Sequence, residues 1–169
     1  MELRDIKTFQ IGDFGSPNNS FWMAELENLL LNFPQLESKM IWDVYCLIFI
    51  EKGEGEIIIE DKKIRADEPK VLFIKPRQYA AFDIARKSKG KIICFKEDFF
   101  SLRFNNNILY SFSFMKHEEK VFQRLNENDC SKVKGLCDFM YKEYTSENAH
   151  KTKIIVGGNT CRIINGNNI

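Results

Sequence analysis

Residues 40–55, MIWDVYCLIFIEKGEG, decide the fold of this chain. Met40–Glu51 is one long run rich in aromatic and β-branched residues, the types that favour β-strands. Lys52-Gly53-Glu54-Gly55 interrupts this run, and glycine supplies the positive φ angles that a tight hairpin needs. The stretch therefore predicts a long strand followed by a hairpin turn.

Short apolar runs continue the pattern up to about residue 95. Turn residues separate them, and Pro76 ends one run because proline lacks the N–H that a central strand donates. Short strands spaced about 8–12 residues apart are typical of a sandwich or barrel and argue against a parallel α/β sheet. Phe21–Leu31 is expected to be a strand followed by a loop through Pro34, and Glu97–Phe100 to begin a short helical turn. The other expected strands cover residues 56–60, 71–75, 79–84 and 91–95.

The hydrophobic period changes after about residue 115. Apolar residues then recur at spacings of three and four, which places them along one face of an α-helix with Ser131 as its expected N-cap. A shorter helix marked by Val121, Phe122 and Leu125 is expected before it, and the short link between the two predicts an antiparallel pair. The stripe of the longer helix consists of Val133, Leu136, Cys137, Met140, Tyr141 and Tyr144.

The composition predicts one domain with a substantial core. The chain has 169 residues, of which 44% are hydrophobic and 29% charged, so disorder is not expected. We expect a β-barrel with an N-terminal arm over residues 1–112 and a helical segment over 113–150. Residues 151–169, rich in Gly and Asn near their end, are expected to form a flexible tail.

Several classes of protein are poorly supported. The 25 basic residues balance 24 acidic ones, which argues against a strongly cationic nucleic-acid binder. No apolar run approaches the roughly 20 residues that cross a bilayer, and the N-terminus lacks a secretory pattern. Five cysteines without a CxxC pattern are typical of reduced thiols, so we expect a cytoplasmic protein. The two histidines are His117 and His150, and the former is expected at a solvated helix end because nothing nearby supplies a nucleophile.

Charge is unevenly distributed along the chain. Residues 1–61 hold four basic and twelve acidic side chains, whereas residues 62–91 hold ten basic and three acidic ones. The basic region is either a docking face for an acidic partner or a set of strands whose charges neutralise those of their neighbours. Its cluster Arg86, Lys87, Lys89 and Lys91 lacks interleaved aromatic residues, which favours a solvated hairpin tip over phosphate contact.

Three segments together resemble a known family. Trp42–Gly55 resembles the first cupin motif in the sensor domains of AraC-type transcription regulators, roughly His-x-His-Asp-Phe-Tyr-Glu-Ile followed by apolar residues and Gly-x-Gly. Lys75–Ala80 is similar to the second motif, Ser-Pro-Gly-Gln-x-His, and Ile92–Phe100 to the last barrel strand with its Glu-x-Phe-Phe turn. Lys142–Tyr144 stands where such domains end their linker helix. The likeness covers about residues 20–148 and implies a mainly β fold with C-terminal helices (α+β): a cupin-type β-barrel or jelly roll followed by an antiparallel helix pair.

The family's metal-binding positions are occupied by different residues here. Where metal-binding cupins use His, His, Glu and His, this chain has Met40, Trp42, Cys46 and Ala80. Divalent ions prefer imidazole and carboxylate ligands, so we expect no metal, no cofactor and no metal-dependent enzyme. No P-loop, GxSxG, HExxH or GxGxxG pattern occurs in the sequence.

The resemblance further implies a C-terminal DNA-binding region of roughly 100 residues with two helix-turn-helix units. Only 25 residues follow Tyr144, and they are not patterned as helices. We therefore expect this chain to be the sensing and pairing half of such a regulator, with no DNA binding by the chain alone and no membrane association.

An apolar pocket inside the barrel is the expected binding site for a small effector, such as a sugar or a small acid. Trp42, Phe73 and Phe82 either form an aromatic wall around a planar ligand or simply fill the barrel. Ala80 replaces a larger residue and leaves space for a ligand. The candidate pocket residues are Met40, Trp42, Cys46, Ile48, Phe73, Ala80, Phe82, Ile92 and Cys94.

Two further pairs of side chains have alternative interpretations. Cys46 and Cys94 are either a redox or soft-metal pair or two small buried hydrophobes, and the second interpretation is favoured. Lys52 and Arg77 flank turns, where they either clamp an anionic effector or are solvated, again with the second favoured.

The sequence thus predicts a non-enzymatic, homodimeric sensor domain. The helix stripe is expected to pack with one edge on its own barrel and the other on a partner subunit. Effector binding would shift the population of helix or arm arrangements. The alternatives are a small stand-alone cupin enzyme and an interaction module with a filled barrel.

Overall fold

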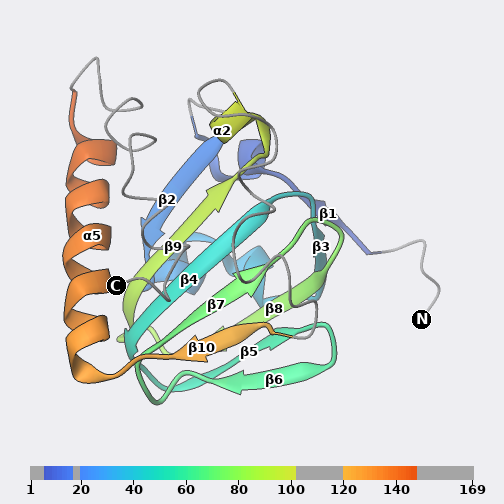
Figure 1. Cartoon of the computed structure of the whole chain (residues 1–169). Helices are drawn as coiled ribbons and strands as arrows, with labels where there is room; N and C mark the ends of the chain where they lie inside the picture. Colours follow the sequence, from blue (N-terminus) through green and yellow to red (C-terminus); the bar gives the residue numbers. More distant parts are fainter. Residues whose placement is uncertain (1–5, 17–19, 102–119, 148–169) are drawn as a thin grey trace.

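The computed structural model describes residues 6–16, 20–101 and 120–147, and it consists of two five-stranded sheets with a helix along one outer face (Figure 1). The elements that precede the long strand of the sequence motif are β1 (Thr8–Phe9), the 3₁₀ helix η2 (Ile11–Phe14), β2 (Phe21–Glu25), α1 (Leu29–Asn32), η3 (Pro34–Glu37) and β3 (Met40–Trp42). Those that follow are β4 (Tyr45–Lys52), β5 (Gly55–Ile59), β6 (Lys62–Arg65), β7 (Lys70–Ile74), β8 (Tyr79–Ile84), β9 (Lys89–Phe95), α2 (Asp98–Ser101), β10 (Phe122–Arg124) and α5 (Glu127–Thr145).

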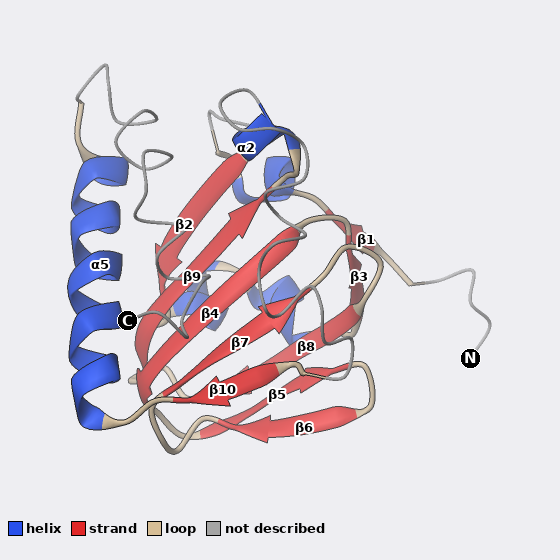
Figure 2. Ribbon diagram, in the orientation of Figure 1, coloured by secondary structure: helices blue, strands red, loops and turns tan. Residues whose placement is uncertain are grey.

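The two sheets are almost entirely antiparallel. The first has the strand order β1-β3-β8-β5-β6, and the second has the order β10-β7-β4-β9-β2. Only the two-residue β1 runs parallel to its neighbour, β3. Figure 2 shows strands from the two sheets facing each other across the core. The prediction of a mainly β structure with C-terminal helical sequence is confirmed.

Strand β4 is buried on both faces, which explains why apolar and polar residues do not alternate along Tyr45–Ile50. Side chains alternate between the two faces of a strand, so Cys46 and Ile48 point into the core between the sheets while Leu47 and Phe49 point to the opposite face. Helix α5 contributes to a second apolar cluster on that opposite face. A strand that is buried on both faces reads as a continuous apolar run.

Tight approaches between strands require glycine at two positions. Gly55 (φ 96°) is the last residue of the predicted turn and the first of β5, and Gly90 (φ 150°) lies opposite Ile50 beside a β-bulge. A Cβ at either position would collide with a backbone carbonyl oxygen, that of Asp83 or that of Phe49. The predicted turn is confirmed, with a positive φ angle at Gly55, but the predicted hairpin is wrong. Strand β4 pairs with β7 and β9 in the second sheet, whereas β5 pairs with β6 and β8 in the first, so the turn carries the chain from one sheet to the other.

The predicted short helix at Val121–Leu125 is wrong. Phe122–Arg124 forms β10, which pairs antiparallel with β7, and the Phe73 N–H donates to the carbonyl of Val121 (2.8 Å). Pairing with a sheet edge satisfies the backbone of this short segment, and that tertiary contact outweighs the local helical spacing. The antiparallel helix pair is consequently wrong as well, because α5 follows a strand.

Helix α5 begins earlier than the sequence predicts. Its N-cap is Asn126, whose side-chain oxygen accepts a hydrogen bond from the Asp129 N–H (2.8 Å), and Ser131 lies inside the helix. Asparagine at this position satisfies an N–H group that the helix itself leaves unpaired. The link to the preceding element therefore shrinks to Leu125 and Asn126.

Two smaller predictions are confirmed. Phe21–Glu25 is a strand, although the loop through Pro34 contains the short helices α1 and η3. The expected helical turn near residue 97 is α2. His117, the boundary at residue 112 and the tail at 151–169 lie outside the described residues.

Candidate ligand-binding site

The structure brings together eight of the nine predicted pocket residues. They come in pairs from four strands of the two sheets, and each side chain is at most 6% exposed. All eight belong to the apolar cluster between the sheets. They are Met40 and Trp42 on β3, Cys46 and Ile48 on β4, Ala80 and Phe82 on β8, and Ile92 and Cys94 on β9.

Phe73 is the exception, and its predicted place in the pocket is wrong. Leu72 and Ile74 on β7 point into the core between the sheets, so the strand alternation turns Phe73 to the opposite face. There it belongs to the apolar cluster that includes residues of α5. Both faces of β7 are apolar between Val71 and Ile74. No polar residue in this stretch therefore indicates which side chains point away from the core.

Trp42 is the chemically distinctive residue of this interior. Its ring is 1% exposed and lies 4.6 Å from the Phe9 ring and 5.7 Å from the Phe82 ring, measured between centroids. Its Nε1–H is buried and has no hydrogen-bond partner. An unsatisfied buried donor costs about 1–3 kcal/mol, so an acceptor placed beside this indole would be stabilised.

Cys46 and Cys94 lie directly opposite each other on β4 and β9, with the Cys94 thiol donating to the Cys46 sulfur at 3.5 Å. Burial, with the neighbouring Cys94 adding to it, raises the pKa of the Cys46 thiol well above its ordinary value. A protonated, buried thiol is a poor nucleophile and a poor metal ligand. This geometry supports the interpretation of the two cysteines as small buried hydrophobes.

The N-terminal segment completes the interior, a role that the sequence pattern did not predict for any of its residues. Phe9, Ile11 and Phe14 are all buried in the core cluster. The Phe14 ring stacks on Trp22 with 3.4 Å between centroids and 6° between planes. Figure 1 shows the blue segment running from β1 along the upper end of the sandwich towards β2. Apolar residues at positions 9, 11 and 14 were the available signal, but they fit neither a strand nor a helix period.

The predicted dimerisation stripe lies against its own domain. Val133, Cys137 and Met140 are fully buried in the cluster on the outer face of the second sheet. Leu136, Tyr141 and Tyr144 are partly buried against the same cluster, and the Tyr144 ring meets Phe21 edge-on at 5.6 Å. The six residues therefore attach the helix to the second sheet.

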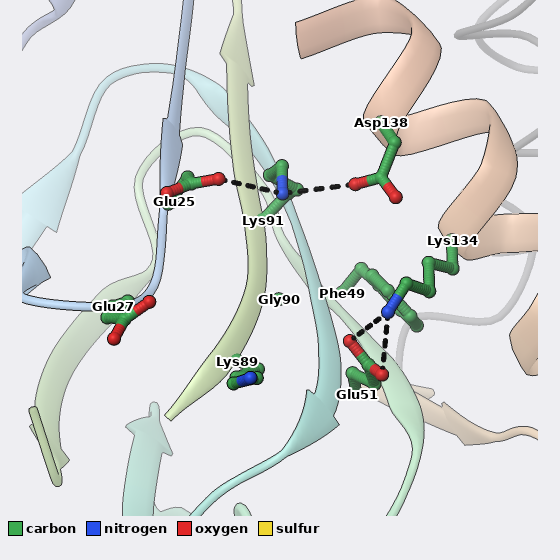
Figure 3. A pocket seen from close by; sticks show the side chains of 9 residues that line it. All are labelled: Glu25, Glu27, Phe49, Glu51, Lys89, Gly90, Lys91, Lys134 and Asp138. Carbon is green, nitrogen blue, oxygen red and sulfur yellow. Dashed lines mark hydrogen bonds and ion pairs between the residues drawn. The ribbon is translucent and has the colours of Figure 1, made fainter. Parts of the chain in front are cut away.

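Ion pairs beside a small hollow reinforce this attachment (Figure 3). The Lys91 ammonium lies 3.3 Å from Glu25 and 3.2 Å from Asp138, and the Lys134 ammonium lies 2.8 Å from Glu51. Partial burial opposes the charge of Lys91, but its hydrogen bonds to Asp138 and Glu25 outweigh this effect and raise its pKa. The hollow has a volume of about 200 Å³. Its charged side chains mainly hold α5 against β4 and β9.

Three of the ten basic residues at 62–91 pair with acidic residues of the region 1–61. Lys63 pairs with Glu56 (3.3 Å), Lys87 with Glu54 (2.7 Å) and Lys91 with Glu25. These pairs join the basic and acidic regions, which supports complementary charge between neighbouring strands at these positions. Lys52 and Arg77, which flank turns, are exposed, as expected for solvated charges.

Comparisons with known proteins add no assignment. No protein-family model matches the chain, and no curated protein matches it. Among the described residues, no three His, Cys, Asp or Glu side chains gather where they could hold a metal ion. Within the same part of the chain, no helix is both long and apolar enough to cross a membrane.

Proposed function

We propose that this chain is the effector-sensing and pairing domain of a transcription regulator of the AraC type, with a small-molecule ligand bound inside the sandwich beside Trp42. The single observation that carries the ligand site is the buried Trp42 Nε1–H without an acceptor. The aromatic and apolar residues around it suit a small molecule that presents one hydrogen-bond acceptor and an otherwise apolar or planar face. The cupin-type motifs of the sequence supply the family.

Withdrawal of the N-terminal segment provides a route for the ligand. Strand β1 pairs with β3 through only two residue pairs, Thr8 with Ile41 and Phe9 with Trp42. Detaching so short an edge strand leaves the other strands paired, and it removes the Phe9 ring from Trp42. A ligand that binds the detached arrangement more tightly would shift the population towards it.

Replacement of Trp42 by phenylalanine tests this ligand site. Thermal-shift screening against sugars and small acids should yield a compound that raises the melting temperature, because a ligand that binds only the folded state stabilises it. The shift should disappear in Trp42→Phe, which lacks the N–H, and persist in Trp22→Phe, the matched variant of the other core tryptophan. A broad panel without any shift, or a shift that survives in Trp42→Phe, would instead support an interaction module with a filled interior.

Pairing of two subunits must use a different face of α5 from the predicted stripe. Gly135 and Phe139 lie one turn apart on the side opposite Val133, Cys137 and Met140. Phe139 is 45% exposed, and a Cβ placed on Gly135 would meet nothing within 4 Å beyond its chain neighbours and the backbone of its own helix. In an antiparallel two-fold pair, the Phe139 ring of each subunit would fill the notch at Gly135 of the other.

Sedimentation of two variants tests this pairing. Phe139→Glu should convert a dimer to a monomer, whereas Leu31→Glu, at another exposed large apolar residue (56%), should leave it unchanged. Gly135→Ala should raise the stability of the monomer by about 1 kcal/mol, because alanine favours the helix interior, while weakening the dimer. A dimer that persists in Phe139→Glu would contradict this arrangement.

A further inference from the structure

A charged network lies at the open edge of the sandwich, where β6 of the first sheet and β10 of the second run close together (Figure 2). Its centre is the ammonium of Lys70, whose side chain is only 3% exposed. This ammonium donates to the carbonyl oxygen of Arg65 (2.6 Å) and lies 3.4 Å from Glu68 and 3.7 Å from Asp67. The buried charge thus holds both carboxylates of the β6–β7 turn in place.

Each of these carboxylates in turn orients an exposed arginine. The Nε of Arg65 lies 2.8 Å from Asp67, and the Nε of Arg124 lies 2.6 Å from Glu68. Burial works against the ionised form of Asp67, but backbone hydrogen bonding and the charge of Arg65 lower its pKa overall. The hydrogen bond from Arg124 lowers the pKa of Glu68. Both carboxylates therefore stay ionised and both guanidinium groups stay anchored at neutral pH.

The outer ends of the two guanidinium groups remain available. The side chains of Arg65 and Arg124 are 78% and 72% exposed, and each directs its Nε towards its carboxylate. No other side-chain hydrogen bond or ion pair involves either group in the part of the chain that the structure describes. Both arginines line one hollow of about 400 Å³, together with Lys63 and the ring of Phe122.

We propose that this hollow binds a phosphate group through Arg65 and Arg124. The network of three cations and two carboxylates has a net charge of +1, which favours an anion. A guanidinium binds an oxyanion best through a fork of two parallel N–H groups that donate to two oxygens. Two guanidinium forks on one ligand therefore need more oxygens than a single carboxylate offers. A tetrahedral phosphate has enough oxygens for both. Lys63 at the rim adds a further positive charge, although it pairs with Glu56.

Nuclear magnetic resonance of the arginine Nε–H groups tests this site directly. Titration with inorganic phosphate should shift the signals of Arg65 and Arg124 in a saturable way. Acetate at the same ionic strength should bind about tenfold more weakly, because it engages only one fork. Non-saturable shifts, or shifts of equal size with chloride, would overturn the proposal.

Variants separate specific binding from general surface charge. Arg65→Gln and Arg124→Gln should each weaken phosphate binding about tenfold, and Arg65→Lys should do so as well because lysine lacks the fork. The control is Lys87→Gln, which removes an equally exposed cation (74%) that pairs with Glu54. Neither Lys87 nor Glu54 lines this hollow, so the change should leave binding unchanged. Equal losses in Arg65→Gln and Lys87→Gln would overturn the proposal. The melting temperature of each variant shows whether it is folded.

The affinities of two further ligands, a sugar phosphate and a phosphoserine peptide, distinguish the two possible sources of the phosphate group. A sugar phosphate that binds as tightly as a phosphoserine peptide would indicate a small phosphorylated metabolite, and a clear preference for the peptide would indicate a phosphorylated protein segment. Either result supports the phosphate site. None of the residues that line the hollow belongs to the predicted pocket around Trp42. A negative result at either site therefore does not affect the proposal for the other.

Discussion

Replacing Gly90 by alanine is expected to destabilise the fold by about 3 kcal/mol or more, the sum of backbone strain and a steric clash. The backbone at Gly90 has φ 150°, a region that side chains with a Cβ rarely adopt. An added Cβ would also collide with the carbonyl oxygen of Phe49 and lie 2.9 Å from Leu26. Both neighbours are held in place, because the Leu26 N–H donates to the Gly90 carbonyl (3.1 Å) and Phe49 pairs with Lys91 between β4 and β9.

Urea unfolding measures this effect, with Gly12→Ala as the control. No atom lies within 4 Å of a Cβ at Gly12, and its φ is not positive, so the control should change the free energy of unfolding by no more than about 0.5 kcal/mol. A Gly90→Ala variant as stable as Gly12→Ala would show that β4 and β9 do not approach each other as closely as described.

Stability is also expected to fall steeply above pH 9. Burial raises the pKa of the Cys137 thiol to about 12, against 9.0 for an exposed thiol. Below pH 9 the thiol is protonated in both the folded and the unfolded chain. Above it, the unfolded chain releases the proton while the folded protein retains it, which costs about 1.4 kcal/mol per pH unit and about 4 kcal/mol by pH 12. The raised pKa of Lys91 acts in the same direction at the upper end of this range.

Urea unfolding between pH 8 and 11.5 tests this dependence in two variants. Cys137→Ala should flatten the decline by about 1.4 kcal/mol per pH unit above pH 9, because the titrating group is gone. The control, Cys130→Ala, removes a partly exposed cysteine near the start of α5 and should flatten it far less. A decline as steep in Cys137→Ala as in the parent protein would mean that other groups control it.

The sequence predicted the strands wherever a local pattern was strong. Met40–Glu51 combines β-branched and aromatic residues and is followed by a glycine-containing turn, and the structure places β3, β4 and a turn there. The run is not one long strand, because β3 and β4 belong to different sheets, and the turn joins two sheets and not the strands of a hairpin. The main helix was predicted from the apolar spacing of residues 133–144. The segment around Val121 failed because three or four apolar residues fit either period, and its pairing partner on β7 lies about 50 residues away in the sequence.

The candidate sites divide in the same way. The interior ring around Trp42 was predicted from the positions that the resemblance to cupins marks, together with strand alternation from those positions. The Arg65–Asp67–Lys70–Glu68–Arg124 network could not be predicted, because Arg124 reaches Glu68 only when β10 joins the edge of the second sheet. A regular hydrophobic period predicts which side chains share one face of a strand, but it does not predict which other strand pairs with it.

The amino-acid sequence by itself determined that the chain is mainly β and where its central strands and main helix lie. It also determined that Met40, Trp42, Cys46 and Ala80 stand at the four positions that the resemblance to cupins aligns with metal ligands. Only the tertiary structure decided that Phe73 faces outwards, that the apolar stripe of α5 is used by its own domain, and that the Trp42 N–H is left without an acceptor. The physical reason is that strand and helix periods are local properties of the chain. Burial, by contrast, depends on which distant segments pack together.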